Sequence, residues 1–232
     1  MRHLHPKRNL RPAIAWTTAD AVVVYLYCFA GAFAAYALGR FVLHDMWWAS
    51  VFSSYSGGLL GLCLPLLWIR RRQGLTREAL GLQRGYLPVW ASVALGVGLA
   101  ILYHLVIRNH LYPPQVGVGT PPSYLALVFT PLSLGGFASV VLTPLSEEVL
   151  IRGFLYTALR QTLGTRLALI VQAVVFTAPH LGTSIYSATS IAVDTFLIGL
   201  TLVLLYEKTV SLYASILCHI ALNYLAALGA VL

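Results

Sequence analysis

Most of this chain consists of apolar stretches that carry almost no charge. An α-helix rises about 1.5 Å per residue, so about 20 residues cross a hydrocarbon core of about 30 Å. The sequence therefore predicts an all-α, polytopic membrane helix bundle of about seven transmembrane helices, the fifth of them short. The apolar stretches lie at about 21–39, 47–69, 88–107, 125–145, 167–181, 189–206 and 211–231.

The composition excludes the other broad classes of protein. The chain has 232 residues, of which 59% are hydrophobic and only 9% are charged, whereas a soluble domain carries about 25% charged residues. A soluble fold of this size cannot keep that much apolar surface from water. We therefore exclude a soluble enzyme, a disordered chain and a fibrous repeat, and expect the lipid bilayer rather than nucleic acid as the partner.

The basic residues predict that the N-terminus is cytoplasmic. Among the 15 Lys and Arg residues, only Arg40 and Arg108 fall outside the segments that this orientation places in the cytoplasm. Such a bias is the usual signature of topology in membrane proteins. We expect an uncleaved first span, an external C-terminus and the plasma membrane of a prokaryote as the location. Tryptophans flank the spans as interface anchors do; they are Trp16, Trp47, Trp48, Trp68 and Trp90.

We predict one membrane domain with two parts. Residues 1–124 contain the N-terminal membrane helices and a basic cytoplasmic loop at 70–82. Residues 125–232 contain helices that carry polar groups where lipid is expected. An ionised side chain at the bilayer centre costs roughly 2.5–3.5 kcal/mol, so each such group indicates a protein interior or a water-filled cavity.

The first polar group combines two glutamates with an arginine. Glu148 and Arg152 are four residues apart, so they share a helix face and can form an ion pair. Glu147 points about 100° away and has no local partner. A carboxylate in such a position can act as a general base. The alternative is that both glutamates mark the exposed cytoplasmic end of the fourth span.

Two histidines and an asparagine complete the polar set. His180 follows Phe176 by one helical turn in the fifth apolar stretch, and His219 precedes Asn223 by one turn in the last. As structural residues they would be a satisfied core histidine and interhelical hydrogen-bond partners. Together with the glutamates they supply the base, the orienting group and the donors that acyl transfer to water requires. Asp194 in the sixth stretch is expected to pair with a buried histidine, to face the cavity or to lie near the outer interface.

These residues form three ordered motifs on separate apolar segments. The motifs read Glu147-Glu148-x-x-x-Arg152, Phe176-x-x-x-His180 and His219-x-x-x-Asn223. The pattern resembles the motifs of the CPBP family, which contains the CAAX prenyl proteases and the bacteriocin-processing (Abi) proteins. The resemblance covers about residues 125–229, whereas the N-terminal part is similar only in being helical and membrane-spanning.

The resemblance implies a hydrolase, an intramembrane endopeptidase that acts on membrane-bound peptides or proteins. By similarity, Glu147 activates the attacking water, His180 helps to hold that water, and His219 and Asn223 stabilise the oxyanion. The supporting residues implied in the same way are Glu148, Arg152 and Phe176.

The metal requirement and two other functions stay open from the sequence. Members of the family are often labelled metalloproteases, and Glu147, His180 and His219 would form a His₂Glu zinc set. The chain has no His-Glu-x-x-His, which favours a metal-free glutamate mechanism. A non-catalytic scaffold or bacteriocin-immunity protein of the same fold is one alternative function, and a proton-coupled transporter is a weaker one.

Overall fold

The computed structural model describes residues 14–73, 78–83, 85–108, 133–181 and 188–229, and no strand occurs among them. The N-terminal helices are α1 (Thr18–Ala37), η1 (Leu38–Val42), α2 (Met46–Gln73), η2 (Glu78–Leu80), α3 (Val89–Tyr103) and η3 (His104–Arg108). The C-terminal helices are α6 (Leu134–Phe137), η5 (Ala138–Leu142), α7 (Thr143–Glu147), η6 (Glu148–Tyr156), α8 (Thr157–Thr177), η7 (Ala178–His180), α9 (Ala188–Thr209) and α10 (Leu212–Gly229). The η elements are short stretches with wider or tighter helical turns than an α-helix.

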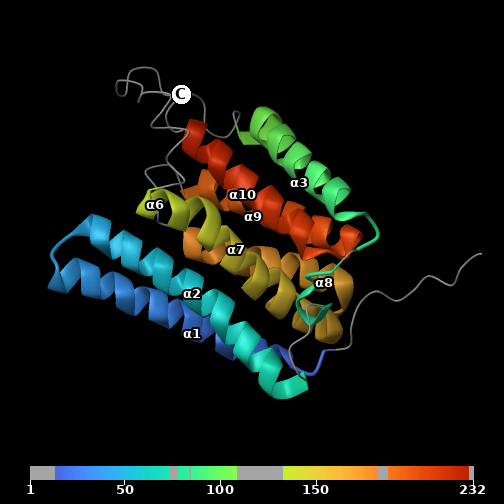
Figure 1. Ribbon diagram of the computed structural model, residues 1–232, viewed down its shortest axis with the longest axis horizontal. Helices are drawn as coiled ribbons and strands as arrows, with labels where there is room; N and C mark the ends of the chain where they lie inside the picture. The colour runs from blue at the N-terminus through green and yellow to red at the C-terminus, as the bar shows by residue number, and fades with distance from the viewer. Residues whose placement is uncertain (1–13, 74–77, 84, 109–132, 182–187, 230–232) are drawn as a thin grey trace, which may run out of the picture.

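The helices form a bundle with its C-terminal elements in the middle. Figure 1 shows α1 and α2 side by side on one flank and α3 beside α10 on the opposite flank, with α6 to α9 between them. All nine residues of η6 are buried. This element, which begins at Glu148, therefore lies at the centre of the packed core.

The expected helical membrane fold is confirmed, but the count of about seven spans is not. Five segments among the described residues are long and apolar enough to cross a membrane, and Leu212–Ala227 is apolar but shorter. The five are Thr18–Val42, Met46–Arg72, Trp90–Ile107, Leu134–His180 and Thr189–Thr209.

The 47-residue segment Leu134–His180 is divided at Gly164. This glycine has φ 73° and ψ 166°, a conformation that ends a helix and that glycine adopts without a Cβ clash. Arg152 and Phe176 lie on opposite sides of the break, and a straight helix would separate them by about 36 Å. The Arg152 guanidinium carbon is instead 4.3 Å from the Phe176 ring centroid. The chain thus folds back at Gly164, residues 147–163 continue the fourth helix, and the fifth begins near Thr165.

Two side chains differ from their expected environment. Trp16 is not an interface anchor: it is 2% exposed, stacks on the Phe154 ring at 4.9 Å and donates its indole N–H to the Phe154 carbonyl at 3.0 Å. Arg152 is fully buried, so it cannot serve as a loop charge in the orientation argument. Both side chains are buried because they find partners in η6: Trp16 stacks on Phe154, and Arg152 pairs with the carboxylate of Glu148.

Some expectations fall outside the described residues. The predicted boundary between residues 124 and 125 lies there, as do positions 74–77 of the basic loop. The described part of that loop contains η2, in which Leu80 is buried in the core.

Candidate active site

A buried ion pair occupies the centre of the bundle. Arg152 and Glu148 are both 0% exposed, and a guanidinium nitrogen of Arg152 lies 3.0 Å from Oε1 of Glu148. The Arg152 guanidinium also donates to the Gly199 carbonyl at 3.4 Å and covers the face of the Phe176 ring. Burying a charged side chain costs several kcal/mol unless the charge is paired and hydrogen-bonded. The expected pair on one helix face is therefore present, and residues of α8 and α9 help to hold it.

His219 of α10 joins this pair through one ring nitrogen. Its Nδ1 lies 2.9 Å from Oε1 of Glu148, and the side chain is almost completely buried. The carboxylate held by Arg152 is an acceptor, so Nδ1 of His219 carries the proton and donates it. This hydrogen bond fixes the tautomer and directs Nε2 away from Glu148.

Glu147 faces the other nitrogen of the same imidazole. Oε2 of Glu147 lies 3.7 Å from Nε2 of His219, and the Glu147 side chain is 26% exposed whereas that of Glu148 is 0% exposed. The two adjacent glutamates therefore have different environments. Glu148 is sealed in the core, whereas Glu147 is accessible and lies at the edge of the polar cluster.

Phe176 connects the two histidines. Its ring centroid lies 5.0 Å from that of His180 and 5.6 Å from that of His219. His180 lies in η7 at the end of α8, and its Nδ1 is 2.8 Å from the Phe176 carbonyl. A carbonyl only accepts, so Nδ1 of His180 donates and Nε2 keeps a lone pair in the neutral ring. Phe176 thus packs against both histidines and, through His219, beside the polar cluster.

Asn223 is bound to the helix that leads to Glu147. Its Nδ2 donates to the Ser139 carbonyl at 2.9 Å. In this stretch the Thr143 N–H bonds to the carbonyl five residues earlier, that of Ala138. The next N–H in that register would reach Ser139, but residue 144 is proline and has none. The Asn223 amide replaces the missing donor and still has a second N–H.

Two further residues hold the site and were not predicted from the sequence. Gln172 is 0% exposed and donates to the Gly199 carbonyl at 3.0 Å, the same carbonyl that Arg152 reaches. A Cβ on Gly199 would lie 3.1 Å from Cδ1 of Phe176 and 3.3 Å from Cα of Ala173, so α8 and α9 approach closely there. The available signal was a polar residue one turn before Phe176 in an apolar stretch.

Asp194 belongs to a separate contact. Its Oδ1 accepts a hydrogen bond of 2.6 Å from the hydroxyl of Tyr103, which also lies 3.1 Å from the Asp194 carbonyl. The partner is thus a tyrosine of α3 and not a histidine. This contact joins α3 to α9 and uses no residue of the three motifs.

The described residues do not present a metal-ligand set. They contain no group of three His, Cys, Asp or Glu side chains placed to hold a metal ion. Nδ1 is engaged in both histidines, by Glu148 in His219 and by the Phe176 carbonyl in His180, so Nε2 is the nitrogen that each ring would offer to a metal ion. Because the described residues do not gather Glu147, His180 and His219 into such a group, we derive no step through a metal.

The comparisons with known proteins find a similarity for the part of the chain that contains this site. Residues 125–225 match the family model described as type II CAAX prenyl endopeptidase Rce1-like. No curated protein and no solved structure matches the chain. The matched range contains every residue of the three motifs. The chain is therefore an integral membrane protein whose residues 125–225 match the CPBP family of CAAX-protease-like intramembrane peptidases.

Proposed function

We propose that this chain is an intramembrane endopeptidase that hydrolyses peptide bonds of membrane-associated substrates. The observation that carries the proposal is the pairing of an accessible Glu147 with His219, whose other nitrogen is held by the buried Glu148–Arg152 pair. A base next to an imidazole of fixed orientation is the arrangement that water-mediated acyl transfer uses.

Attack by water would begin at Glu147. Its carboxylate takes one proton from a water molecule while the water oxygen bonds to the carbonyl carbon of the scissile peptide. Nε2 of His180 accepts the second hydrogen of that water and orients it, because Nδ1 of His180 is engaged by the Phe176 carbonyl. The electron pair of the carbonyl double bond moves to its oxygen and gives a tetrahedral oxyanion.

His219 and Asn223 would stabilise the oxyanion. Asn223 uses the N–H that remains after its bond to Ser139. His219 donates from Nε2 only when both of its nitrogens carry protons, and the carboxylates of Glu148 and Glu147 lie on either side to balance that charge. Loss of one such donor typically costs about 10²–10³-fold in rate.

Collapse of the intermediate completes the reaction. The carbon–nitrogen bond breaks, and Glu147 returns the proton it took from water to the departing nitrogen. The products are a new carboxyl terminus and a new amino terminus, and Glu147 is again ionised. One water is consumed for each peptide bond broken, and Glu147 acts first as a base and then as an acid.

A peptide-library experiment tests the proposal. Purified full-length protein in detergent is incubated with membrane-tethered peptides, with and without a prenyl group, and the products are identified by mass spectrometry. We expect cleavage by the wild type and none by Glu147→Ala or His180→Ala. The matched control is Glu207→Gln, since Glu207 pairs with Arg160 and Tyr156 and belongs to no motif.

Each outcome separates the proposed function from its alternatives. Cleavage that persists in both Glu147→Ala and His180→Ala would refute the site assignment. If the wild type binds peptides but cleaves none of them, a non-catalytic scaffold or bacteriocin-immunity function would be favoured. Prenyl-dependent cleavage would place the substrate among CAAX proteins, and prenyl-independent cleavage would place it among other membrane peptides.

A further inference from the structure

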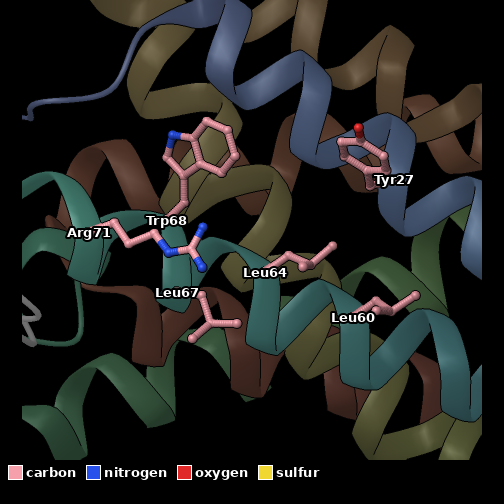
Figure 2. A pocket seen from close by; sticks show the side chains of 6 residues that line it. All are labelled: Tyr27, Leu60, Leu64, Leu67, Trp68 and Arg71. Carbon is pink, nitrogen blue, oxygen red and sulfur yellow. The ribbon is translucent and has the colours of Figure 1, made fainter.

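A groove with the features of a ligand-binding site lies on α1 and α2. It has a volume of about 430 Å³ and is lined by Tyr27 of α1 and by Leu60, Leu64, Leu67, Trp68 and Arg71 of α2. Figure 2 shows the α2 residues in a row along their helix, with Tyr27 projecting from α1. Sites for small ligands have volumes of about 300–1,000 Å³ and are mostly apolar with a few polar groups.

The groove has the length of one membrane leaflet. Its α2 residues recur at spacings of three and four, which places them on one helix face. Leu60 and Arg71 are eleven residues apart, which corresponds to about 16 Å along an α-helix. Half of a hydrocarbon core of about 30 Å is about 15 Å. A chain lying from Arg71 to Leu60 would therefore reach from the interface to the bilayer midplane.

Polar contacts between α1 and α2 lie toward both ends of the groove. The Ser56 hydroxyl donates to the Gly31 carbonyl at 3.2 Å, one turn before Leu60. At the other end, Arg72 forms an ion pair of 3.2 Å with Asp20. Tyr25, two residues before Tyr27 and so on another side of α1, bonds with its hydroxyl to the Val175 carbonyl of α8. The groove thus opens on a side of α1 that differs from the side packed on α8.

Arg71 supplies the charge of the groove. It is exposed, and it forms no ion pair within the described residues, whereas the adjacent Arg72 is paired with Asp20. The remaining lining is four aliphatic or indole side chains and one tyrosine. A guanidinium at the end of an apolar groove matches a molecule with an apolar tail and an anionic head, because Arg binds phosphate through two parallel hydrogen bonds.

We propose that this groove binds an anionic phospholipid, with one acyl chain along Leu60, Leu64 and Leu67 and the phosphate against Arg71. The bond-forming group is Arg71, and Trp68 lines the same groove three residues earlier, as indole rings near lipid headgroups do. The site uses no residue of the three motifs, so it stands apart from the proposed peptidase reaction.

Native mass spectrometry of the full-length protein tests the site. The probes are phosphatidylglycerol and phosphatidylcholine with identical acyl chains, each titrated into protein in detergent. We expect phosphatidylglycerol to bind more tightly to the wild type. Arg71→Gln should weaken that binding at least about fivefold, the effect of one basic residue at a lipid surface. Arg70→Gln is the matched control, because it removes the same charge from an exposed neighbour outside the groove.

A second measurement places the acyl chain. Phosphatidylglycerol with brominated acyl chains should quench the part of the tryptophan emission that Trp68→Phe removes, and Leu64→Trp, which fills the groove, should weaken binding of both lipids. Equal losses in Arg71→Gln and Arg70→Gln would overturn the proposal in favour of unspecific attraction to a basic surface. Unchanged binding in Arg71→Gln, or emission of Trp68 that bromine leaves unquenched, would also overturn it. Circular dichroism and gel filtration of each variant establish that it is folded.

Discussion

Removing the Glu148 carboxylate should separate the stability of the bundle from its chemistry. Glu148→Ala leaves the fully buried Arg152 without its ion-pair partner. At 3.0 Å and an effective dielectric constant of about 20, the lost attraction is about 5–6 kcal/mol. Relief of the desolvation of Glu148 offsets part of it, so we expect a loss of about 3–5 kcal/mol, the usual range for a broken buried pair.

The double variant Glu148→Ala/Arg152→Met provides the diagnostic comparison. It removes both charges and fills part of the space with an apolar side chain, so most of the lost stability should return. Activity should not return, because Nδ1 of His219 still lacks the carboxylate that orients it. We expect both variants to cleave peptide at least about 100-fold more slowly than the wild type.

The assays are denaturant unfolding in detergent, read by circular dichroism, and the initial rate of peptide cleavage. The control is Arg72→Ala, whose ion pair with Asp20 is exposed, with 53% of the Arg72 side chain accessible. This variant should change stability by no more than about 1 kcal/mol. A loss in Glu148→Ala as small as that in Arg72→Ala would refute the reasoning. Full activity of the double variant would refute the role given to His219.

Three further predictions concern other contacts. Gly199→Ala places a Cβ 3.1 Å from Phe176, so we expect a loss of about 1–3 kcal/mol by overpacking and slower cleavage, whereas Gly98→Ala, with nothing within 4 Å, should change neither. Tyr103→Phe removes the hydroxyl that Asp194 accepts at 2.6 Å, so unfolding should become about 1–3 kcal/mol easier while cleavage by the folded protein is retained; a lost rate would instead connect Asp194 to the chemistry. Chelator treatment should leave cleavage unchanged, and a loss restored by zinc would replace the metal-free mechanism with a site at Glu147, His180 and His219.

The fold class followed from the sequence because lipid imposes a simple rule on the chain. Uncharged stretches of about 20 residues had one physical interpretation, and the described helices agree with it. The number of spans was harder to predict, because continuity of a helix and crossing of a membrane are different properties. Gly164 divides one apolar segment and returns the chain on itself. A single glycine among helix-forming residues does not by itself predict a turn, so the position of this one could not be inferred from the sequence.

The site was predictable to the extent that its contacts are local. The four-residue spacing of Glu148 and Arg152 predicted their ion pair, because neighbours on one helix face must meet. The contact of His219 with both glutamates joins positions about 70 residues apart, and no local spacing encodes it. The hydrogen bonds of Arg152 and Gln172 to the Gly199 carbonyl could not be predicted either, because every residue has a backbone acceptor and the sequence does not mark which one is used.

The most direct test of the account is the single-turnover rate of Glu147→Gln on a peptide that the wild type cleaves. Glutamine keeps the size of the side chain but cannot take a proton from water. We predict a rate lower by about 10²–10⁴-fold, the usual contribution of a general base, with unchanged folding and unchanged peptide binding. A rate within about tenfold of the wild type would contradict the assignment of Glu147 as the base.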